Sequence, residues 1–287
     1  MPLPVNSAER APMRRLEPLS AHTTLRIGGP AEQFFEPQRP EDLAALLSRL
    51  IAEQLPFRLL GGGANTLAPD GGVRGAVVHT GSLRRVFREG ESQLRAWAGA
   101  TLPQLVRTAA DSGLSGLERL IGVPGQLGGG LAMNAGSASW GIWDLVEEVT
   151  VWDPEFEGGG EQSAIRVLRP ADVLPSYRDG RLGARIVLEA CLRLQPTDPR
   201  AIRAVQEDFL QRKNASQPVT LSSAGCAFKN PAGDSAGRLV DAAGLKGLRV
   251  GGAEISPRHA NFIVNCGGAT AADVRTLIER AEATVAE

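Results

Sequence analysis

Hydrophobic residues recur at helical spacing over residues 41–51, and two acidic residues begin the segment, so an amphipathic helix is predicted there. Two short apolar runs, 57–60 and 75–80, predict strands, and the sequence Gly-Gly-Gly-Ala-Asn directly follows the first run. A further strand is predicted over 94–99. We expect a helix after it, with Thr101 as the N-cap and a glycine as the stop.

Apolar runs over 147–152 and 184–194 predict more strands in the middle of the chain. Residues 122–136 are too apolar for a linker and too rich in glycine for an ordinary helix, so we interpret them as a ligand-facing loop. The remaining predictions are helices over 200–213 and near 235–243, strands near 253–256 and 260–265, and a final helix with a capping box of Thr270 and Asp273.

The length of 287 residues favours two or three domains over one compact core. The composition turns polar around 196–199, which indicates a domain boundary near residue 200. We therefore predict four stretches along the chain, which are an N-terminal extension over 1–19 and domains or subdomains over 20–83, 84–199 and 200–287.

The charge balance excludes two classes of partner. With 31 basic and 32 acidic residues, the net charge of −1 gives no field suited to nucleic acid or an anionic membrane surface. The first twenty residues carry charges and prolines where a signal peptide needs an apolar run, and no stretch approaches the roughly 20 apolar residues of a membrane span. We expect a cytoplasmic protein.

The few cysteines and histidines argue against metal chemistry. The three cysteines form no CxxC pair, which favours reduced thiols over a disulfide framework or a structural zinc site. Cys191 and Cys266 are interpreted as small buried hydrophobic residues. None of the three histidines has helical metal-ligand spacing to another. We expect an organic cofactor and no metal.

The two glycine-rich stretches are the candidate cofactor site. Gly61–Asn65 lacks the lysine of a P-loop and the GxGxxG spacing, so by itself it indicates a tight turn about as often as a phosphate site. Stretch 122–136 changes this balance, because two nearly uncharged glycine loops suit a long, partly apolar dinucleotide such as FAD. Backbone N–H groups can bind its pyrophosphate without a lysine.

Two further segments carry candidate chemistry. The arginine after the chain's only tyrosine, Tyr177, can present a fork of donors to a carboxylate, although an arginine in a turn is usually just solvated. Cys226 follows a small, flexible Ser-Ala-Gly turn and precedes Lys229, so the thiol can face a ligand or simply pack. His259 precedes an apolar strand and is interpreted only as a substrate contact.

Seven blocks in this order resemble one family. They are HTTLRIGGPA (22–31), LGGGANTLAPDGGVRGAVV (60–78), GLERLIGVPGQLGGGLAMNAG (116–136), YRDG (177–180), SAGCAFKNP (223–231), SAGRLVDAAGLKGLRVGGAEIS (235–256) and HANFIVN (259–265). Together they are similar to the UDP-N-acetylenolpyruvoylglucosamine reductase (MurB) family, in its second type, over roughly residues 20–280. Seven ordered blocks make the resemblance specific where one alone would not.

The resemblance implies an α+β fold, with a two-subdomain FAD-binding half of the vanillyl-alcohol-oxidase (PCMH) type and a C-terminal α+β substrate-binding domain. The FAD-binding subdomains would be 20–83 and 84–199, and the substrate domain 200–287. It implies that NADPH reduces FAD, which then passes a hydride from N5 to C3 of UDP-N-acetylglucosamine enolpyruvate, with a proton added at C2. The product would be UDP-N-acetylmuramate, a peptidoglycan precursor. We expect a monomer.

The family's motifs assign roles residue by residue. Cys226 stands where the family usually has the proton-donating serine, and Arg178 matches its carboxylate-binding arginine. Tyr177, Lys229, Asn230 and His259 become substrate contacts. The implied FAD contacts are Gly61, Gly62, Gly63, Ala64, Asn65, Gly122, Pro124, Gly125, Gly128, Gly129, Asn134, Ala135, Gly136 and Ile186.

Three alternatives stay open at this stage. Cys226 can pack only, with water supplying the proton. The family's C-terminal glutamate, which assists protonation, has no match among the residues of this sequence, so a UDP-sugar binder without catalysis is one alternative function. Another FAD-dependent oxidase or dehydrogenase on the same fold is the other.

Overall fold

The computed structural model describes residues 11–137, 139–156 and 164–286. The chain divides into two compact units, and each unit is assembled from separate segments. Among the described residues, unit 1 comprises 11–14, 34–62 and 75–210, and unit 2 comprises 15–33, 63–74 and 211–286. The boundaries after residues 19, 83 and 199 stay predictions, and the first ten residues of the predicted extension lie outside the described part.

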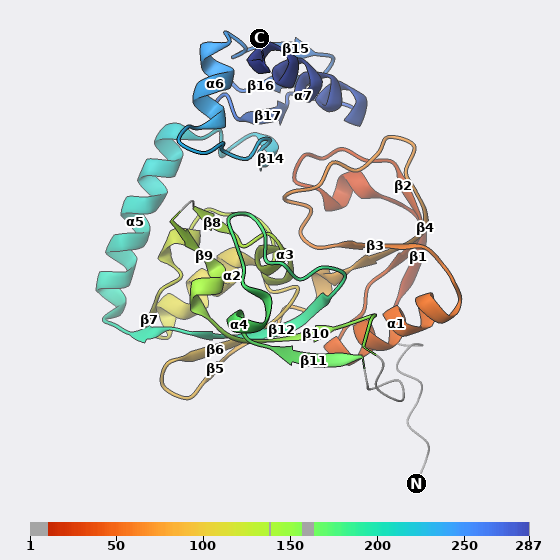
Figure 1. Ribbon diagram of the computed structural model, residues 1–287, viewed down its shortest axis with the longest axis vertical. Helices are drawn as coiled ribbons and strands as arrows, with labels where there is room; N and C mark the ends of the chain where they lie inside the picture. The colour runs from red at the N-terminus through yellow and green to blue at the C-terminus, as the bar shows by residue number, and fades with distance from the viewer. Residues whose placement is uncertain (1–10, 138, 157–163, 287) are drawn as a thin grey trace. The chain divides into compact units, whose positions relative to one another are not determined.

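The secondary structure alternates short strands and helices (Figure 1). The helices are α1 (Pro40–Ala52), α2 (Leu102–Asp111), α3 (Leu127–Ala132), α4 (Pro170–Val173), α5 (Pro199–Ser216), α6 (Ala236–Ala242) and α7 (Ala271–Ala286). The strands are β1 (Met13–Pro18), β2 (Pro30–Phe35), β3 (Phe57–Leu60), β4 (Val73–His79), β5 (Val86–Glu89), β6 (Gln93–Trp97), β7 (Leu114–Ser115), β8 (Gly136–Ser137), β9 (Trp140–Gly141), β10 (Val146–Trp152), β11 (Ile165–Leu168), β12 (Ile186–Arg193), β13 (Gln195–Pro196), β14 (Ser222–Cys226), β15 (Arg249–Val250), β16 (Ala253–Ile255) and β17 (Phe262–Asn265).

Most of the predicted elements are confirmed, and two interpretations are wrong. The Thr101 hydroxyl oxygen accepts a hydrogen bond from the Gln104 amide and caps α2 as predicted (3.2 Å). The stretch 122–136 contains the short helix α3, although its glycines argued against a helix. The expected Ser-Ala-Gly turn before Cys226 is strand β14 instead.

A five-stranded antiparallel sheet with the order β11-β10-β12-β6-β5 forms the body of unit 1. Figure 1 shows α2 and α3 on one face of it, and buried residues such as Ala96, Val149 and Leu192 pack there. Arg95 projects from β6 and forms ion pairs with three glutamates of the same sheet, Glu89 on β5, Glu148 on β10 and Glu189 on β12. The alternation of apolar and charged residues therefore separates a core face from a polar face.

A second core in unit 1 supports the first glycine loop. The apolar side of α1 packs with residues of β4 and β12, and Leu43, Leu46 and Leu47 are fully buried. Strand β3 pairs with β4 in parallel, with Leu60 opposite His79. Because β3 ends at Leu60, this register brings the start of the first glycine loop beside the end of β4.

Unit 2 has its own sheet and core. The four-stranded sheet has the order β14-β17-β16-β15, and α7 lies against β15 and β16. Leu25 and Ile27, far away in the sequence, join its buried cluster with residues such as Ile263 and Leu277. Compact packing in this unit therefore needs the segment 15–33 as well as the C-terminal residues.

The first turn of α7 is capped twice. The predicted capping box is confirmed, because Asp273 N–H donates to Thr270 Oγ1 (3.1 Å) and Thr270 N–H donates to Asp273 Oδ2 (2.9 Å). The Asp70 carboxylate also accepts hydrogen bonds from the amides of Ala271 (2.7 Å) and Ala272 (3.1 Å). These bonds fasten the loop 63–74 to α7.

None of the described helices is long and apolar enough to cross a membrane.

Asp70→Ala removes the acceptor for two amides at the start of α7. We expect the free energy of unfolding to fall by about 1 kcal/mol, as for the loss of a helix cap. Urea denaturation of the two proteins measures this difference. Asp111→Ala is the matched control, since Asp111 forms only an exposed ion pair with Arg203. Equal losses in both variants would show that the Asp70 cap contributes nothing specific.

Candidate active site

The first glycine loop is shaped by a close backbone contact at Gly63. Gly63 has a φ of +60°, and a Cβ there would lie 2.1 Å from the carbonyl oxygen of His22. Both the amide and the hydroxyl of Thr24 donate to the Gly63 carbonyl (3.1 and 3.2 Å). Glycine is therefore required at this position by the fold of unit 2 itself, with or without a bound phosphate. The next residue, Ala64, is half-buried, while Asn65 is exposed.

The start of this loop meets the second glycine stretch within unit 1. A Cβ at Gly62 would lie 3.2 Å from the Cα of Gly125, and one at Gly61 would lie 3.3 Å from Gln126 Oε1. The Thr80 hydroxyl donates to the same Gln126 oxygen (2.7 Å), and both side chains are buried. The structure thus brings together Gly61, Gly62 and Gly125. The Thr80–Gln126 hydrogen bond joins the end of β4 to the second glycine stretch beside them.

Helix α3 continues the second glycine stretch and is anchored to β6 and the residues after it. The amides of Leu127 and Gly128 donate to the carbonyls of Ala100 and Ala98, both at 2.8 Å. The N–H of Gly128 is therefore already used, and Gly128 serves close packing against Ala98, 3.2 Å from an added Cβ. Gly129 is different, since it is exposed and nothing lies within 4 Å of a Cβ built on it.

The turn that carries Tyr177 and Arg178 closes on itself. Ser176 and Asp179 exchange backbone hydrogen bonds of 2.8 and 3.1 Å. Arg178 has a φ of +58°, which is uncommon for a residue with a side chain, and its guanidinium lies 5.6 Å from the Tyr177 ring centroid. Both side chains are half-buried. Arg178 is thus held in one region of the turn instead of extending freely into solvent.

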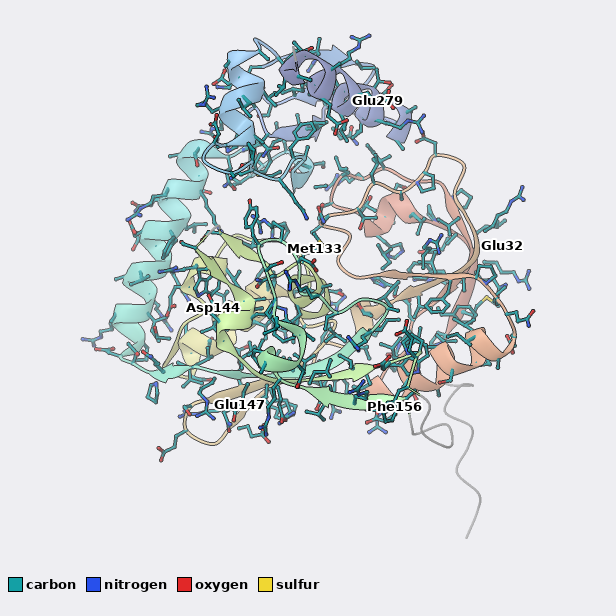
Figure 2. The ribbon with its side chains drawn as sticks, viewed as in Figure 1. Glu32, Met133, Asp144, Glu147, Phe156 and Glu279 are labelled. Atoms are coloured by element: carbon teal, nitrogen blue, oxygen red, sulfur yellow. The ribbon has the colours of Figure 1, made fainter. Side chains whose placement is uncertain are left out.

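Two hydrogen bonds attach this turn to the end of α3. The Gly180 amide donates to the Ala132 carbonyl (2.9 Å), and Asn134 Nδ2 donates to the Ser176 carbonyl (2.9 Å). Asn134 Oδ1 accepts the amide of Trp143 (3.3 Å). Met133, labelled in Figure 2, directly follows α3 and is exposed. Asn134 therefore uses one end of its side-chain amide to hold the arginine turn and the other to hold Trp143, and a direct cofactor contact stays a prediction.

For the remaining predicted cofactor residues, the structure shows no contact that distinguishes a role in cofactor binding from a role in packing. Gly136 has no room for a side chain, because a Cβ would lie 2.1 Å from the Trp140 carbonyl oxygen. Ala135 is buried, and Ile186 is half-buried at the start of β12, opposite Trp152. Gly122 and Pro124 are exposed. Their roles toward FAD remain predictions.

Cys226 lies at the end of β14, after an irregularity in its pairing with β17. Ser223 pairs with Val264 and Cys226 with Phe262, so the register shifts between them, at a point where Gly225 has a φ of +77°. This is the geometry of a β-bulge, which re-aims the residues that follow it. Cys226 is exposed.

The other two exposed candidates differ in their contacts. Lys229 is exposed near the bulge, three residues beyond Cys226. The Oδ1 atom of Asn230 accepts the Ala236 amide at the start of α6 (3.1 Å). A substrate contact by Asn230 would therefore use its Nδ2 group.

His259 is half-buried and has a defined tautomer. Its Nδ1 accepts the amide of Asn261 (3.2 Å), so the neutral ring carries its proton on Nε2. The ring lies edge-on to Phe262, with centroids 5.0 Å apart. Burial lowers the pKa of His259 below its usual 6.5.

The predictions for two cysteines had opposite outcomes. Cys191 is 1% exposed within β12, as expected, and burial raises its pKa to about 11. The prediction of a buried Cys266 is wrong. Cys266 follows the end of β17, is exposed, and donates to Glu254 (3.3 Å).

Sequence reasoning missed three supporting residues, Thr80, Gln126 and Asn261. All three are polar and buried, and each stands next to apolar or glycine residues in the sequence. A polar side chain in such surroundings needs a hydrogen-bond partner, and this signal was available from the sequence. The partner of each side chain, however, required the tertiary structure.

An open concavity of about 710 Å³ lies elsewhere in unit 1. Trp140, Phe209 and side chains of both charges line it, including Asp144 and Glu147, which are labelled in Figure 2. It includes none of the predicted site residues. It does not bear on the candidate active site.

Comparison with known proteins decides the family. Residues 31–155 match the description of an FAD binding domain, and 217–287 match the C-terminal domain of UDP-N-acetylenolpyruvoylglucosamine reductase. The UDP-N-acetylenolpyruvoylglucosamine reductase of Moorella thermoacetica is 45% identical over 271 residues, covering 94% of this chain and 87% of that protein. The chain belongs to the UDP-N-acetylenolpyruvoylglucosamine reductase family.

Other members of the UDP-N-acetylenolpyruvoylglucosamine reductase family agree. Reductase 2 of Symbiobacterium thermophilum is 43% identical over 277 residues, covering 95% of this chain and 87% of that protein. The crystal structure of the Thermus caldophilus enzyme superimposes with a TM-score of 0.80 at 38% identity, covering 96% of this chain and 95% of that chain. The predicted α+β fold, with its PCMH-type FAD-binding half and C-terminal domain, is confirmed. The protein is an FAD-dependent oxidoreductase.

The residues of the glycine loops fit an FAD cofactor. A Cβ on Gly62 would lie 3.2 Å from the Cα of Gly125, so these two segments pack closely, while the open space beside Gly129 admits a ligand close to the backbone. The loops carry almost no charge, which suits the isoalloxazine and adenine rings as well as a pyrophosphate bound by backbone donors.

Gly129→Ala separates cofactor binding from folding. The new methyl group meets no protein atom, so we expect the stability of the FAD-free protein to be unchanged or slightly higher. If FAD passes close to this backbone, the methyl group raises its dissociation constant at least about tenfold, equivalent to ~1.4 kcal/mol. Quenching of flavin fluorescence measures this. Gly71→Ala, which also meets open space, is the control, and equal FAD affinity in both variants would contradict the predicted contact.

His259 should contribute a pH-dependent term to stability. Its folded pKa is below the unfolded value of about 6.5, so the unfolded chain binds the proton more readily. The contribution is therefore complete above about pH 6.5 and is lost as the pH falls toward the folded pKa. We expect His259→Gln to lose less Tm than the unmodified protein between pH 7.5 and 5.5. Thermal unfolding of both proteins at these pH values measures it, and equal losses would refute the assignment.

Proposed function

We propose that the protein reduces UDP-N-acetylglucosamine enolpyruvate to UDP-N-acetylmuramate, a step of peptidoglycan precursor synthesis, with NADPH as the reductant. Support comes from family membership and from the relatives named for this reaction. The observation that carries the proposal is the arginine turn fastened to α3. This turn presents a fixed cation, Arg178, and is attached to the second glycine stretch, the candidate cofactor loop that contains α3.

Arg178 meets a specific electrostatic demand of this reaction. Addition of a hydride at C3 of the enolpyruvyl group leaves negative charge that spreads from C2 onto the carboxylate. A guanidinium presents two parallel donors to a carboxylate and stays charged at every relevant pH. Stacking on Tyr177 and the closed turn limit its motion, so little reorganisation is needed when the charge develops.

FAD, when bound, would supply the two-electron chemistry that links oxidation of NADPH to reduction of the substrate at C3. Cys226 then supplies the proton to C2, and its thiolate regains a proton from solvent. A thiol is more acidic than the serine hydroxyl usual at this position in the family, so general-acid catalysis is retained. The overall reaction consumes one NADPH and one proton for each product.

Three other side chains of unit 2 suit the rest of the substrate. The ammonium of Lys229 and the Nδ2 group of Asn230 are donors for the phosphate and sugar oxygens of a UDP-sugar. Neutral His259 donates through Nε2, since its Nδ1 is already an acceptor. We propose these three as substrate contacts, with Tyr177 as a fourth.

Oxidation of NADPH with and without UDP-N-acetylglucosamine enolpyruvate tests the function, with Cys226→Ser and Cys226→Ala beside the unmodified protein. We expect Ser to keep much of the activity and Ala to lose on the order of 10²-fold in kcat, as for loss of a general acid. Cys266→Ala is the matched control, because Cys266 is the other exposed cysteine and contacts Glu254.

Each alternative gives a different outcome. Equal rates for the unmodified protein and Cys226→Ala would assign the proton to water. Rapid oxidation by molecular oxygen with no response to the UDP-sugar would indicate a different flavin oxidase. Binding of the UDP-sugar without NADPH consumption would indicate a non-catalytic binder.

A further inference from the structure

Asn261 makes an unusual set of contacts with the backbone after Cys226. It is 2% exposed and immediately precedes β17. Its Oδ1 accepts the Phe228 amide (2.8 Å), its Nδ2 donates to the Phe228 carbonyl (3.0 Å), and its own carbonyl accepts the Ala227 amide (2.7 Å). One residue therefore provides three hydrogen bonds to the two residues that follow Cys226.

These bonds begin where the regular strand pairing ends. The last backbone pair between β14 and β17 joins Cys226 to Phe262, after the bulge at Gly225. Beyond this pair, the side-chain amide of Asn261 bonds to the backbone of Phe228 as a neighbouring strand would, because it offers one donor and one acceptor, spaced as in a peptide group. An aspartate lacks the donor, and a leucine lacks both groups.

The same residue also contacts His259. The backbone N–H of Asn261 donates to His259 Nδ1 (3.2 Å) and so fixes the tautomer of the ring. Asn261 is thus bonded to the segment of Cys226 on one side and to His259 on the other. None of its polar groups needs to touch a substrate for it to influence both.

We propose that Asn261 is a positioning residue that fixes the thiol of Cys226, through the backbone of Ala227 and Phe228, in the orientation needed to protonate the substrate. The inference rests on the proposed function, in which Cys226 is the proton donor. Loss of the side-chain bonds of Asn261 should therefore affect reduction of the substrate and leave reduction of the flavin by NADPH unchanged, since that half-reaction needs no proton from Cys226.

Asn261→Asp tests this with a minimal change of shape. The carboxylate keeps the acceptor for the Phe228 amide but sets an oxygen against the Phe228 carbonyl. A displacement of about 1 Å at a catalytic group costs roughly 10²-fold in rate. We expect that loss in the reoxidation of reduced flavin by UDP-N-acetylglucosamine enolpyruvate, measured by stopped flow, with the rate of flavin reduction by NADPH and the substrate KM within threefold of normal.

Asn265→Asp is the matched control. Asn265 lies at the other end of β17, and its side chain also bonds to backbone, donating to Leu25 (2.8 Å) and accepting from Gly267 (2.9 Å). This variant makes the same chemical change in a structural side-chain amide at the opposite end of β17. Both half-reactions should stay within about threefold of normal in this variant.

A second readout does not depend on activity. Asn261→Leu removes both side-chain bonds, so hydrogen exchange at the Phe228 amide should accelerate at least about tenfold, while the amides of β16 keep their protection. If the unmodified protein fails to reduce the UDP-sugar, the proposed function fails, and this local exchange still decides whether Asn261 holds the segment.

Three results would overturn the inference. One is normal reoxidation of the flavin in Asn261→Asp, and another is unchanged exchange at Phe228 in Asn261→Leu. The third is loss of flavin and of cooperative unfolding in both Asn261 variants but not in Asn265→Asp, because that would make Asn261 a residue of global folding. Normal Cys226→Ala activity would instead remove the proton-donor role on which the inference rests.

Discussion

Close approach between backbone segments is the constraint on which the candidate site depends. Within unit 1, Gly62 lies against Gly125, and a Cβ on Gly180 would lie 2.0 Å from the Leu131 carbonyl oxygen. Within unit 2, Gly63 lies against the His22 carbonyl. The backbone contacts at Gly63 and Gly180 can form only where a side chain is absent, and a side chain at Gly62 would force its neighbour to shift. Within unit 1 the glycines thus allow loops that are distant in the sequence and almost uncharged to lie close together, which suits a dinucleotide cofactor.

A short series of hydrogen bonds connects the second glycine stretch to the turn that carries Arg178. The glycine stretch leads into α3, the end of α3 holds Gly180, and Asn134 holds Ser176, so the position of Arg178 is tied to the candidate cofactor loop by the fold of one unit. The corresponding contacts in unit 2 are different. There, a β-bulge precedes Cys226, and the buried side-chain amide of Asn261 bonds to the backbone that follows it. In both places the candidate reactive side chain is exposed or half-buried, and a side-chain amide, half-buried at Asn134 and buried at Asn261, bonds to the backbone near it.

The sequence predicted elements with strong periodicity or caps, such as α1, α2 and the capping box of α7, because those signals are local. It failed where distant contacts decide the conformation. Glycines 128–130 disfavour a helix, yet bonds from Leu127 and Gly128 to Ala100 and Ala98 stabilise α3. Ser223 to Cys226 resembles a turn until pairing with β17 makes it a strand. The roles of Arg178 and Cys226 came from the family resemblance, because residue type and spacing alone could not distinguish them from a solvated arginine and a packed cysteine.

The most direct test of the account is an anaerobic single turnover. The FAD-loaded protein is reduced with one equivalent of NADPH, UDP-N-acetylglucosamine enolpyruvate is added, and the flavin absorbance near its visible maximum is followed with the unmodified protein and with Arg178→Gln. The account predicts that the unmodified protein recovers the oxidised spectrum with one equivalent of UDP-N-acetylmuramate formed. In Arg178→Gln, reduction by NADPH should be unchanged, with recovery slowed on the order of 10²-fold or more. A flavin that stays reduced in the unmodified protein, or equal recovery in both proteins, would contradict it.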